Sequence, residues 1–255
     1  MTNLLIMAGA PIAALAVSRG DGAEDLLSYD PKEVWLDSAV GSAAHINIDF
    51  GIVRPIDTVF LGHVLPPAEG ATWTITGGPA GYTDVTLKAA GALRAADRPG
   101  LLPAMSHAFW TGDAAMIRYL RLSVVQPAGA PLSAGTILAG SAFVPTWNKE
   151  WGSGRRVIDT GTATALPSGG FAMVDGARKG SYSFTLGDLT DEEVDWLYAL
   201  QLDVGETRPV LVVEDPDATA GQLYRIHYGR FAGLRAYERR NPEQTRWEIT
   251  VEDWV

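Results

Sequence analysis

The sequence predicts an all-β protein, in which a β-sandwich is followed by a β-rich domain with one short α-helix. Three observations favour this class. The 255 residues include 28 Gly and 15 Pro, which divide the chain into many short segments. Runs rich in β-branched or aromatic residues recur between these turn signals. No helical pattern long enough for a βαβ unit separates these runs, which argues against a parallel α/β sheet.

The expected strands of the first half show the alternation of a half-buried sheet. In Ala44–Phe50, apolar and polar residues alternate strictly, so we expect Ile46, Ile48 and Phe50 to face a core. The strands expected in this part of the chain are Ala44–Phe50, Thr58–Leu61, Thr72–Thr76, Val85–Lys88, Ile117–Val125 and Ile137–Val144.

Composition and charge exclude several classes of function. Asp and Glu number 30 against 20 Lys and Arg, which gives a formal charge of −10. Nucleic-acid backbones and anionic membranes attract clustered cations, so we expect neither nucleic-acid binding nor membrane insertion. The chain has no Cys, which excludes disulfides, thiolate nucleophiles and Cys-ligated zinc. The four His residues stand singly, without ligand spacing, so we expect no metal site and no cofactor.

An apolar, uncharged stretch at residues 3–17 leaves two interpretations open. It resembles the hydrophobic part of a secretion signal, and Ala14-Leu15-Ala16 resembles a cleavage site. However, no Lys or Arg precedes the stretch and Pro11 interrupts it. It is also shorter than the roughly 20 residues that span a bilayer. We therefore favour a structural segment, either strands or an interface arm, over a targeting signal.

A change of composition places a domain boundary near residue 128. The Pro- and Gly-containing residues 126–131 are typical of a linker. We therefore expect a first domain at 1–127, including an N-terminal arm, and a second domain at 128–255. Within the second domain, residues 147–154 predict a long turn.

One helix is predicted in the second domain, near residues 190–200. Thr190 is a suitable N-cap residue, and Glu193 completes a capping box three residues later. Three acidic residues in the first turn match the positive end of the helix dipole. Val194 and Leu197 then begin an apolar stripe that we expect to lie on a core.

Strands are expected after the helix. Pro209–Glu214 and Leu223–Arg230 flank a turn at residues 215–221, which indicates a hairpin. The chain closes on residues 245–255, where apolar and charged residues alternate. This pattern predicts a C-terminal strand whose inward-facing residues are Trp247, Ile249 and Val251.

No catalytic motif occurs in the sequence. The nucleophile elbow, the zinc-protease helix, the Walker A loop and the dinucleotide-binding loop are all missing. Residues 214–217 have the oxygen density of a calcium loop but not its ligand spacing. We therefore expect no enzymatic activity. A glycosidase-type enzyme is the least favoured alternative, because no acid and base pair can be named among 30 carboxylates.

The first domain resembles the discoidin, or galactose-binding-like, jelly roll over about residues 20–126. The family implies a sugar- or surface-binding fold whose ligands bind on loops at one end. No single binding motif of the family is matched, so no binding residue is carried over. The segments that carry the resemblance, in the order in which the family has them, are Asp30–Trp35, His45–Gly51, Ile56–Gly62, Thr72–Ile75 and Ile117–Leu122.

The second domain resembles proteins encoded in the tail modules of long-tailed bacteriophages. The resemblance implies a non-enzymatic virion component of the tail tip, a distal-tail or adaptor subunit that is present in the host cytoplasm during assembly. The implied partners are copies of itself in a ring and the neighbouring tail tube and tail hub proteins. The residues that carry the resemblance are Gly180–Leu186, the capped helix, Arg208–Val213 and Trp247–Trp254.

Two groups of residues are candidates for binding. Trp147 and Trp151, together with the N-terminal apolar stretch, are candidates for a subunit interface, and packing on their own subunit is the competing interpretation. The alternative function is a carbohydrate-binding module without catalysis, in which Trp73, His107 or Trp110 stack on the rings of a host surface glycan. For His107, a packed loop is the competing interpretation. Both functions can coexist in one subunit.

Overall fold

The computed structural model describes residues 3–37, 43–65, 70–95, 106–127, 131–241 and 244–254. The chain forms two compact units, and each is described by itself. The first unit comprises Met1–Val144 with Val213–Ile226, and the second comprises Pro145–Val212 with His227–Val255. The domain boundary near residue 128 stays a prediction.

Antiparallel strands build most of the first unit, which confirms the predicted fold class. Its main sheet has the order β2-β4-β7-β5-β6, with β9 also paired to β4, and β3 pairs with β8. Two 3₁₀ helices lie at Ala23–Leu27 and Gln222–Arg225. The strands are β1 (Leu5–Met7), β2 (Ala14–Val17), β3 (Trp35–Asp37), β4 (Ala44–Val64), β5 (Thr72–Gly78), β6 (Val85–Ala92), β7 (Ser106–Val125), β8 (Leu132–Ala134) and β9 (Thr136–Gly140).

Two strands of this unit are much longer than predicted. β4 has 21 residues and β7 has 20, and their pairing is interrupted by shifts in register. One shift follows Asp49, where Gly51 adopts a φ of 77° that favours glycine. Such bulges bend a strand without ending it. The same strand β4 therefore pairs with β2 near its start and with β9 near its end.

The core of the first unit is formed by the residues that the alternation placed inward. Ile46, Ile48 and Phe50 are buried, as predicted. Trp35 and Trp73 are the largest side chains of this core. The N-terminal stretch contributes β1 and β2, so it occurs as strands in this structure.

The second unit is a sheet with one helix. Its strand order is β14-β15-β17-β13-β10, with β16 also paired to β17. The predicted hairpin corresponds to β14 and β15, and the predicted C-terminal strand corresponds to β17. The elements are β10 (Gly154–Asp159), β11 (Thr162–Ala165), β12 (Phe171–Val174), β13 (Arg178–Leu189), α1 (Asp191–Val204), β14 (Val210–Val213), β15 (Ile226–Phe231), β16 (Glu238–Asn241) and β17 (Gln244–Asp253).

The predicted capping box is present at the start of α1. The Thr190 Oγ1 atom accepts a hydrogen bond from the Glu193 amide at 3.3 Å, and the Thr190 amide donates to the Glu193 carboxylate at 2.8 Å. The helix continues beyond residue 200 because the apolar stripe continues to Val204. Gly205, with a positive φ of 57°, ends it. No helix among the described residues is long and apolar enough to cross a bilayer.

The two faces of this sheet differ in character. Register places the buried Tyr182, Phe184 and Leu186 of β13 on the same face as the inward residues of β17. The opposite face is polar, and there the hydroxyl groups of Ser183 and Thr250 lie 2.9 Å apart. Because α1 has buried residues along one stripe, the helix covers the apolar face.

Candidate assembly surface

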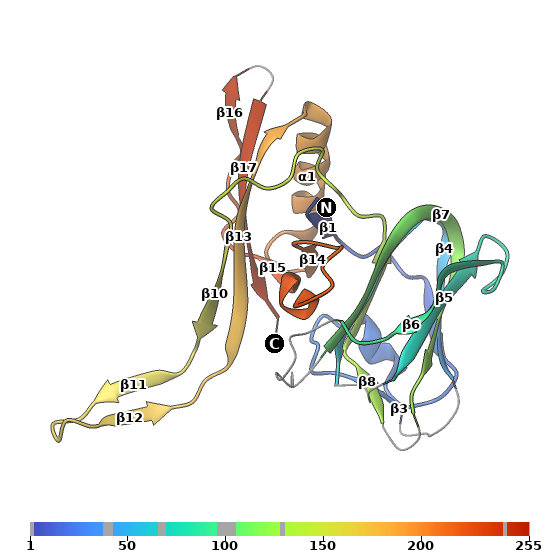
Figure 1. The fold of residues 1–255 in the computed structure, drawn as a ribbon, viewed down its shortest axis with the longest axis horizontal. Helices are drawn as coiled ribbons and strands as arrows, with labels where there is room; N and C mark the ends of the chain where they lie inside the picture. Colours follow the sequence, from blue (N-terminus) through green and yellow to red (C-terminus); the bar gives the residue numbers. More distant parts are fainter. Residues whose placement is uncertain are drawn as a thin grey trace. The chain divides into compact units, whose positions relative to one another are not determined.

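A two-stranded ribbon extends from the edge of the second unit's sheet. β10 pairs with β13 from Gly154 to Asp159, and β11 and β12 continue the ribbon beyond that point (Figure 1). We call residues 154–179 the arm and residues 162–174 its tip. Within the described chain, β11 and β12 pair only with each other. A two-stranded hairpin with nothing packed on it is marginally stable in water.

The tip has one wholly apolar face. Ala163 pairs with Met173 and Ala165 pairs with Phe171, so these four side chains lie on the same side of the ribbon. All four are exposed, Phe171 by 63% and Met173 by 72%. The other face carries two threonines and the exposed Val174. Exposed apolar patches on proteins are often interaction sites.

The arm bends at a defined place between its root and its tip. Asp159–Arg178 is the last pair of the root, and Thr162–Val174 is the first pair of the tip. Residues 160 and 161 join the two pairs on one strand, whereas residues 175–177 join them on the other strand, which therefore has one more residue. The Asp159 carboxylate accepts hydrogen bonds from the Gly161 amide at 2.8 Å and from Arg178 Nε at 3.0 Å. These two hydrogen bonds lower the pKa of Asp159, so the carboxylate stays ionised and holds the bend at neutral pH.

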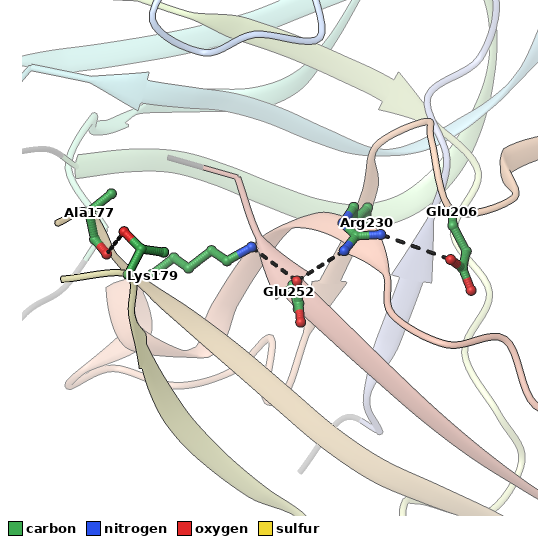
Figure 2. Close-up of polar contacts among 6 residues, drawn as sticks. Ala177, Lys179, Glu206, Arg230 and Glu252 are labelled. Carbon is green, nitrogen blue, oxygen red and sulfur yellow. Dashed lines mark hydrogen bonds and ion pairs between the residues drawn. The ribbon is translucent and has the colours of Figure 1, made fainter. Parts of the chain in front are cut away.

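An ion-pair network fixes the root of the arm to the sheet. Glu252 of β17 accepts from Lys179 Nζ at 3.0 Å and from Arg230 at 3.2 Å, and Arg230 also faces Glu206 at 4.0 Å (Figure 2). The Lys179 hydrogen bond, with the charges of Lys179 and Arg230, lowers the pKa of Glu252. Ion pairs thus link three adjacent strands where β13 leaves the sheet.

The two tryptophans predicted as interface residues precede the arm. Trp151 is fully exposed and Trp147 is 65% exposed. Both lie in the irregular segment between residue 145 and β10, as the predicted turn required. Their packing on their own subunit is therefore slight. Their role in an interface stays a prediction.

An apolar groove of about 300 Å³ lies beside α1 in the same unit. Tyr198 and Leu202 of α1 form one wall, and Tyr237 and the ring of Trp247 lie within the groove lining. The groove is preformed, because Trp247 Nε1 donates to the Arg235 carbonyl at 2.8 Å and the Tyr237 and Trp247 rings lie 5.3 Å apart. The remaining lining residues are Gln201, Leu234, Arg235 and Ala236.

The three residues predicted to stack on a sugar do not form one site. Trp73 is 1% exposed and belongs to the core, so neither face of its ring is open to a ligand. His107 is also buried, with its ring 5.2 Å from that of Phe60. Trp110 is half-buried against the core. It lies near the start of β7, whereas Trp73 pairs with Val124 near the end of β7, so the two side chains are far apart along this strand. Of the three, Trp110 alone keeps an exposed part.

A different surface of the first unit combines two arginines, two tyrosines and a carboxylate. Arg118 forms a bidentate pair with Asp49 at 3.0 and 3.2 Å and lies over the Tyr119 ring. Arg121 lies over the Tyr82 ring, and Tyr82 meets Tyr119 edge to face. The Arg118 and Gly51 hydrogen bonds lower the pKa of Asp49. We call these residues, with Asn47, the polar face; it presents fixed donors and half-buried aromatic rings.

Sequence reasoning missed the tip and the groove. A signal for the tip was present, because Phe171–Val174 is an apolar run between Gly169-Gly170 and Asp175-Gly176. Such a run usually indicates a buried strand, and only the structure shows it exposed. The groove joins residues distant in sequence, so no local pattern predicts it. No group of three or more potential metal ligands occurs among the residues that the structure describes.

No protein-family model and no curated protein matches the chain. About half of the chain matches carbohydrate-binding-type (CBM32-like) jelly-roll domains at low identity. One is the CBM32 of AlyQ in complex with 4,5-unsaturated mannuronic acid, with 19% identity, a TM-score of 0.38, and coverage of 52% of this chain and 98% of that chain.

Two further structures show the range of proteins that share this half. The Ruminococcus gnavus GH29 fucosidase E1_10125 with fucose has 12% identity and a TM-score of 0.39; the match covers 51% of this chain but only 25% of the fucosidase. Reduced XRCC1 bound to the DNA polymerase beta catalytic domain has 13% identity and a TM-score of 0.40, with 52% and 99% coverage. The matched proteins thus bind different partners.

Proposed function

We propose that this chain is a non-enzymatic structural subunit that assembles with copies of itself through the arm. The observation that carries the proposal is the apolar face of the tip, which is exposed and whose two strands pair only with each other in the described part of the chain. Burying a Phe or Met side chain contributes about 1.5–3 kcal/mol. A surface that covered the tip would therefore stabilise the arm.

The distribution of charge favours a second copy of the chain as the partner that covers the tip. The arm has four cations and two carboxylates, whereas the whole chain has a formal charge of −10. An arm of net charge +2 is attracted to the acidic remainder of another copy. The charged residues of the arm are Arg155, Arg156, Asp159, Asp175, Arg178 and Lys179.

The assembly that we propose is a ring at the tip of a bacteriophage tail. The support is the resemblance of the second domain to tail-module proteins, together with the arm. Neighbouring tail tube and tail hub proteins are the further partners, and the virion is the place of function. Each subunit also contains the first unit, a carbohydrate-binding-module-like sandwich.

Sedimentation velocity over a range of protein concentrations tests the assembly. We expect a discrete oligomer for the intact chain, and for Met173→Glu a dissociation constant raised about tenfold to hundredfold, because an apolar contact becomes a buried charge. Met116, which is 57% exposed on β7, provides the matched control Met116→Glu, which should assemble normally. A single species of monomer mass at every concentration contradicts the proposal.

Glycan binding by the first unit is a second candidate function, and the polar face favours it. Paired arginines and tyrosines supply the hydrogen bonds and ring surfaces that sugars need. A glycan array with the intact chain tests this. We expect binding that Arg121→Ala abolishes, because Arg121 donates to Asn47 at 2.7 Å and holds the Tyr82 ring. An empty array, or binding unchanged in this variant, rejects the polar face as the site.

A further inference from the structure

We infer that the polar face of the first unit binds an acidic sugar, and that Arg121 binds the carboxylate of this sugar. The inference rests on the second candidate function, glycan binding, and names the class of glycan. It depends on the arrangement of the polar face on the sheet, on an arginine without an acidic partner, and on the neighbours that hold this arginine.

The polar face lies on the outer side of the main sheet. Register places Asn47 of β4, Arg121 of β7 and Thr76 of β5 in one row across three strands, and Asp49 and Tyr119 form the next row. These five side chains are all partly exposed. The residues that alternate with them along β4 and β7 belong to the core. The polar side chains are therefore gathered on the solvent side, in rows about 7 Å apart.

Arg121 has no carboxylate partner among the described residues. Its Nε donates to Asn47 Oδ1 at 2.7 Å, and its guanidinium lies 5.2 Å from the centre of the Tyr82 ring. These two contacts hold the side chain, and neither uses the two terminal nitrogens. The terminal nitrogens thus keep their hydrogens for a ligand, and a guanidinium can donate to both oxygens of one carboxylate.

The carboxylates described beside the polar face, Asp49 and Asp84, have partners of their own. Asp49 accepts hydrogen bonds from Arg118 at 3.0 and 3.2 Å. Asp84, in the turn between β5 and β6, accepts from two backbone amides of that turn at 3.1 and 2.8 Å. Neither forms an ion pair with Arg121, so the positive charge of Arg121 is available to an anionic ligand.

The effect of Arg121 on His45 agrees with an uncompensated charge. His45 lies in the row next to Arg121, where its Nδ1 atom is 2.9 Å from Ser123 Oγ. Burial lowers the pKa of His45, and the positive charges of Arg121 and Arg19 lower it further. His45 is therefore neutral at pH 7, so it adds no charge to the polar face but can exchange hydrogen bonds with sugar hydroxyls.

The balance of charge limits how acidic the ligand can be. The chain has a formal charge of −10, which repels polyanions. One uncompensated arginine neutralises one carboxylate. The polar face thus favours a sugar with an isolated carboxylate over a densely sulfated glycan. The Asn47 amide nitrogen and the Tyr82 hydroxyl, which have no hydrogen-bond partner in the described part of the chain, can bind hydroxyl groups of the same sugar.

A glycan array with neutral, sialylated, uronic-acid-containing and sulfated oligosaccharides tests the class of ligand. We expect the intact chain to bind sialylated or uronic-acid-containing members. The strongest of these is then compared, by isothermal titration calorimetry, with the same oligosaccharide after chemical reduction of its carboxyl groups to primary alcohols. The reduction removes the charge and keeps the rest of the sugar, and we expect it to weaken binding at least tenfold.

Three variants test the role of Arg121. Arg121→Gln removes the cation but keeps an amide that can donate to Asn47, so it should bind the acidic oligosaccharide as weakly as the intact chain binds the reduced one. Arg121→Lys keeps the charge without the planar guanidinium and should retain part of the preference. Arg240→Gln removes an exposed arginine of β16 in the second unit and is the matched control, which should bind like the intact chain. Circular dichroism verifies that each variant is folded.

Each contrary outcome has a defined meaning. If the array shows binding to neutral or sulfated glycans alone, the chain binds glycans but the inference is wrong. Equal affinity for the acidic oligosaccharide and its reduced form also overturns the inference, as does an Arg121→Gln variant that keeps the preference. An equal loss of affinity in Arg240→Gln would assign the effect to net charge and not to Arg121. An array without any bound glycan contradicts the second candidate function itself.

Discussion

Removing the tip is expected to convert the protein into a folded monomer. Asp159 and Arg178 face each other at the end of the β10–β13 ladder, so residues 160–177 can be replaced by Asn-Gly, which forms a two-residue hairpin turn. The deleted residues pair only among themselves or at the bend, and they include the apolar face of the tip. The excision therefore removes the proposed assembly contact and leaves both cores intact.

Sedimentation velocity and circular dichroism measure the two parts of this expectation. The excised chain should have monomer mass at concentrations where the intact chain assembles, with a β-sheet signal that is otherwise preserved. A full-length control, Phe171→Thr with Met173→Thr, keeps the ribbon and its β propensity but removes its large apolar side chains. It should also be monomeric. An excised chain that keeps the original oligomer mass would show that the arm is not the interface.

Local signals in the sequence predicted local structure well. Thr190 and Glu193 determine the start of α1 through contacts three residues apart, and those contacts are present. Alternation in β17 correctly placed Trp247, Ile249 and Val251 on the buried face. Such features depend on neighbouring residues, so a single sequence contains the information they need.

Features that depend on distant residues were not predicted. Gly51 and Pro55 break the alternation, so the sequence suggested separate strands where bulges keep β4 continuous. The solvent exposure of a side chain could also not be predicted from its neighbours in the sequence. Phe171 and Trp73 both occur in short runs that predict strands. However, Phe171 lies on an exposed two-stranded ribbon, whereas Trp73 lies in the core, on a strand that is paired on both sides. The number of strands packed on a residue decides its exposure, and that number is a property of the whole fold.

Trp73→Ala is expected to lower the free energy of unfolding and to have no direct effect on the affinity for a ligand. The side chain is 1% exposed, and its strand pairs with β6 on one side and β7 on the other. Truncating a buried Trp leaves a cavity and costs about 3–5 kcal/mol in the free energy of unfolding. This is a large fraction of the 5–15 kcal/mol that stabilises a typical domain. Urea denaturation followed by circular dichroism measures the loss.

Trp110→Ala and Trp147→Ala are the matched comparisons, since all three variants remove the same side chain. Trp110 is half-buried, so its loss should lower the free energy of unfolding by less than that of Trp73. Trp147 is 65% exposed, and its replacement should change stability by no more than about 0.5 kcal/mol. The expected order of destabilisation is thus Trp73, Trp110, Trp147. A Trp73→Ala protein of unchanged stability that loses glycan binding would place Trp73 in a ligand site and contradict its assignment to the core.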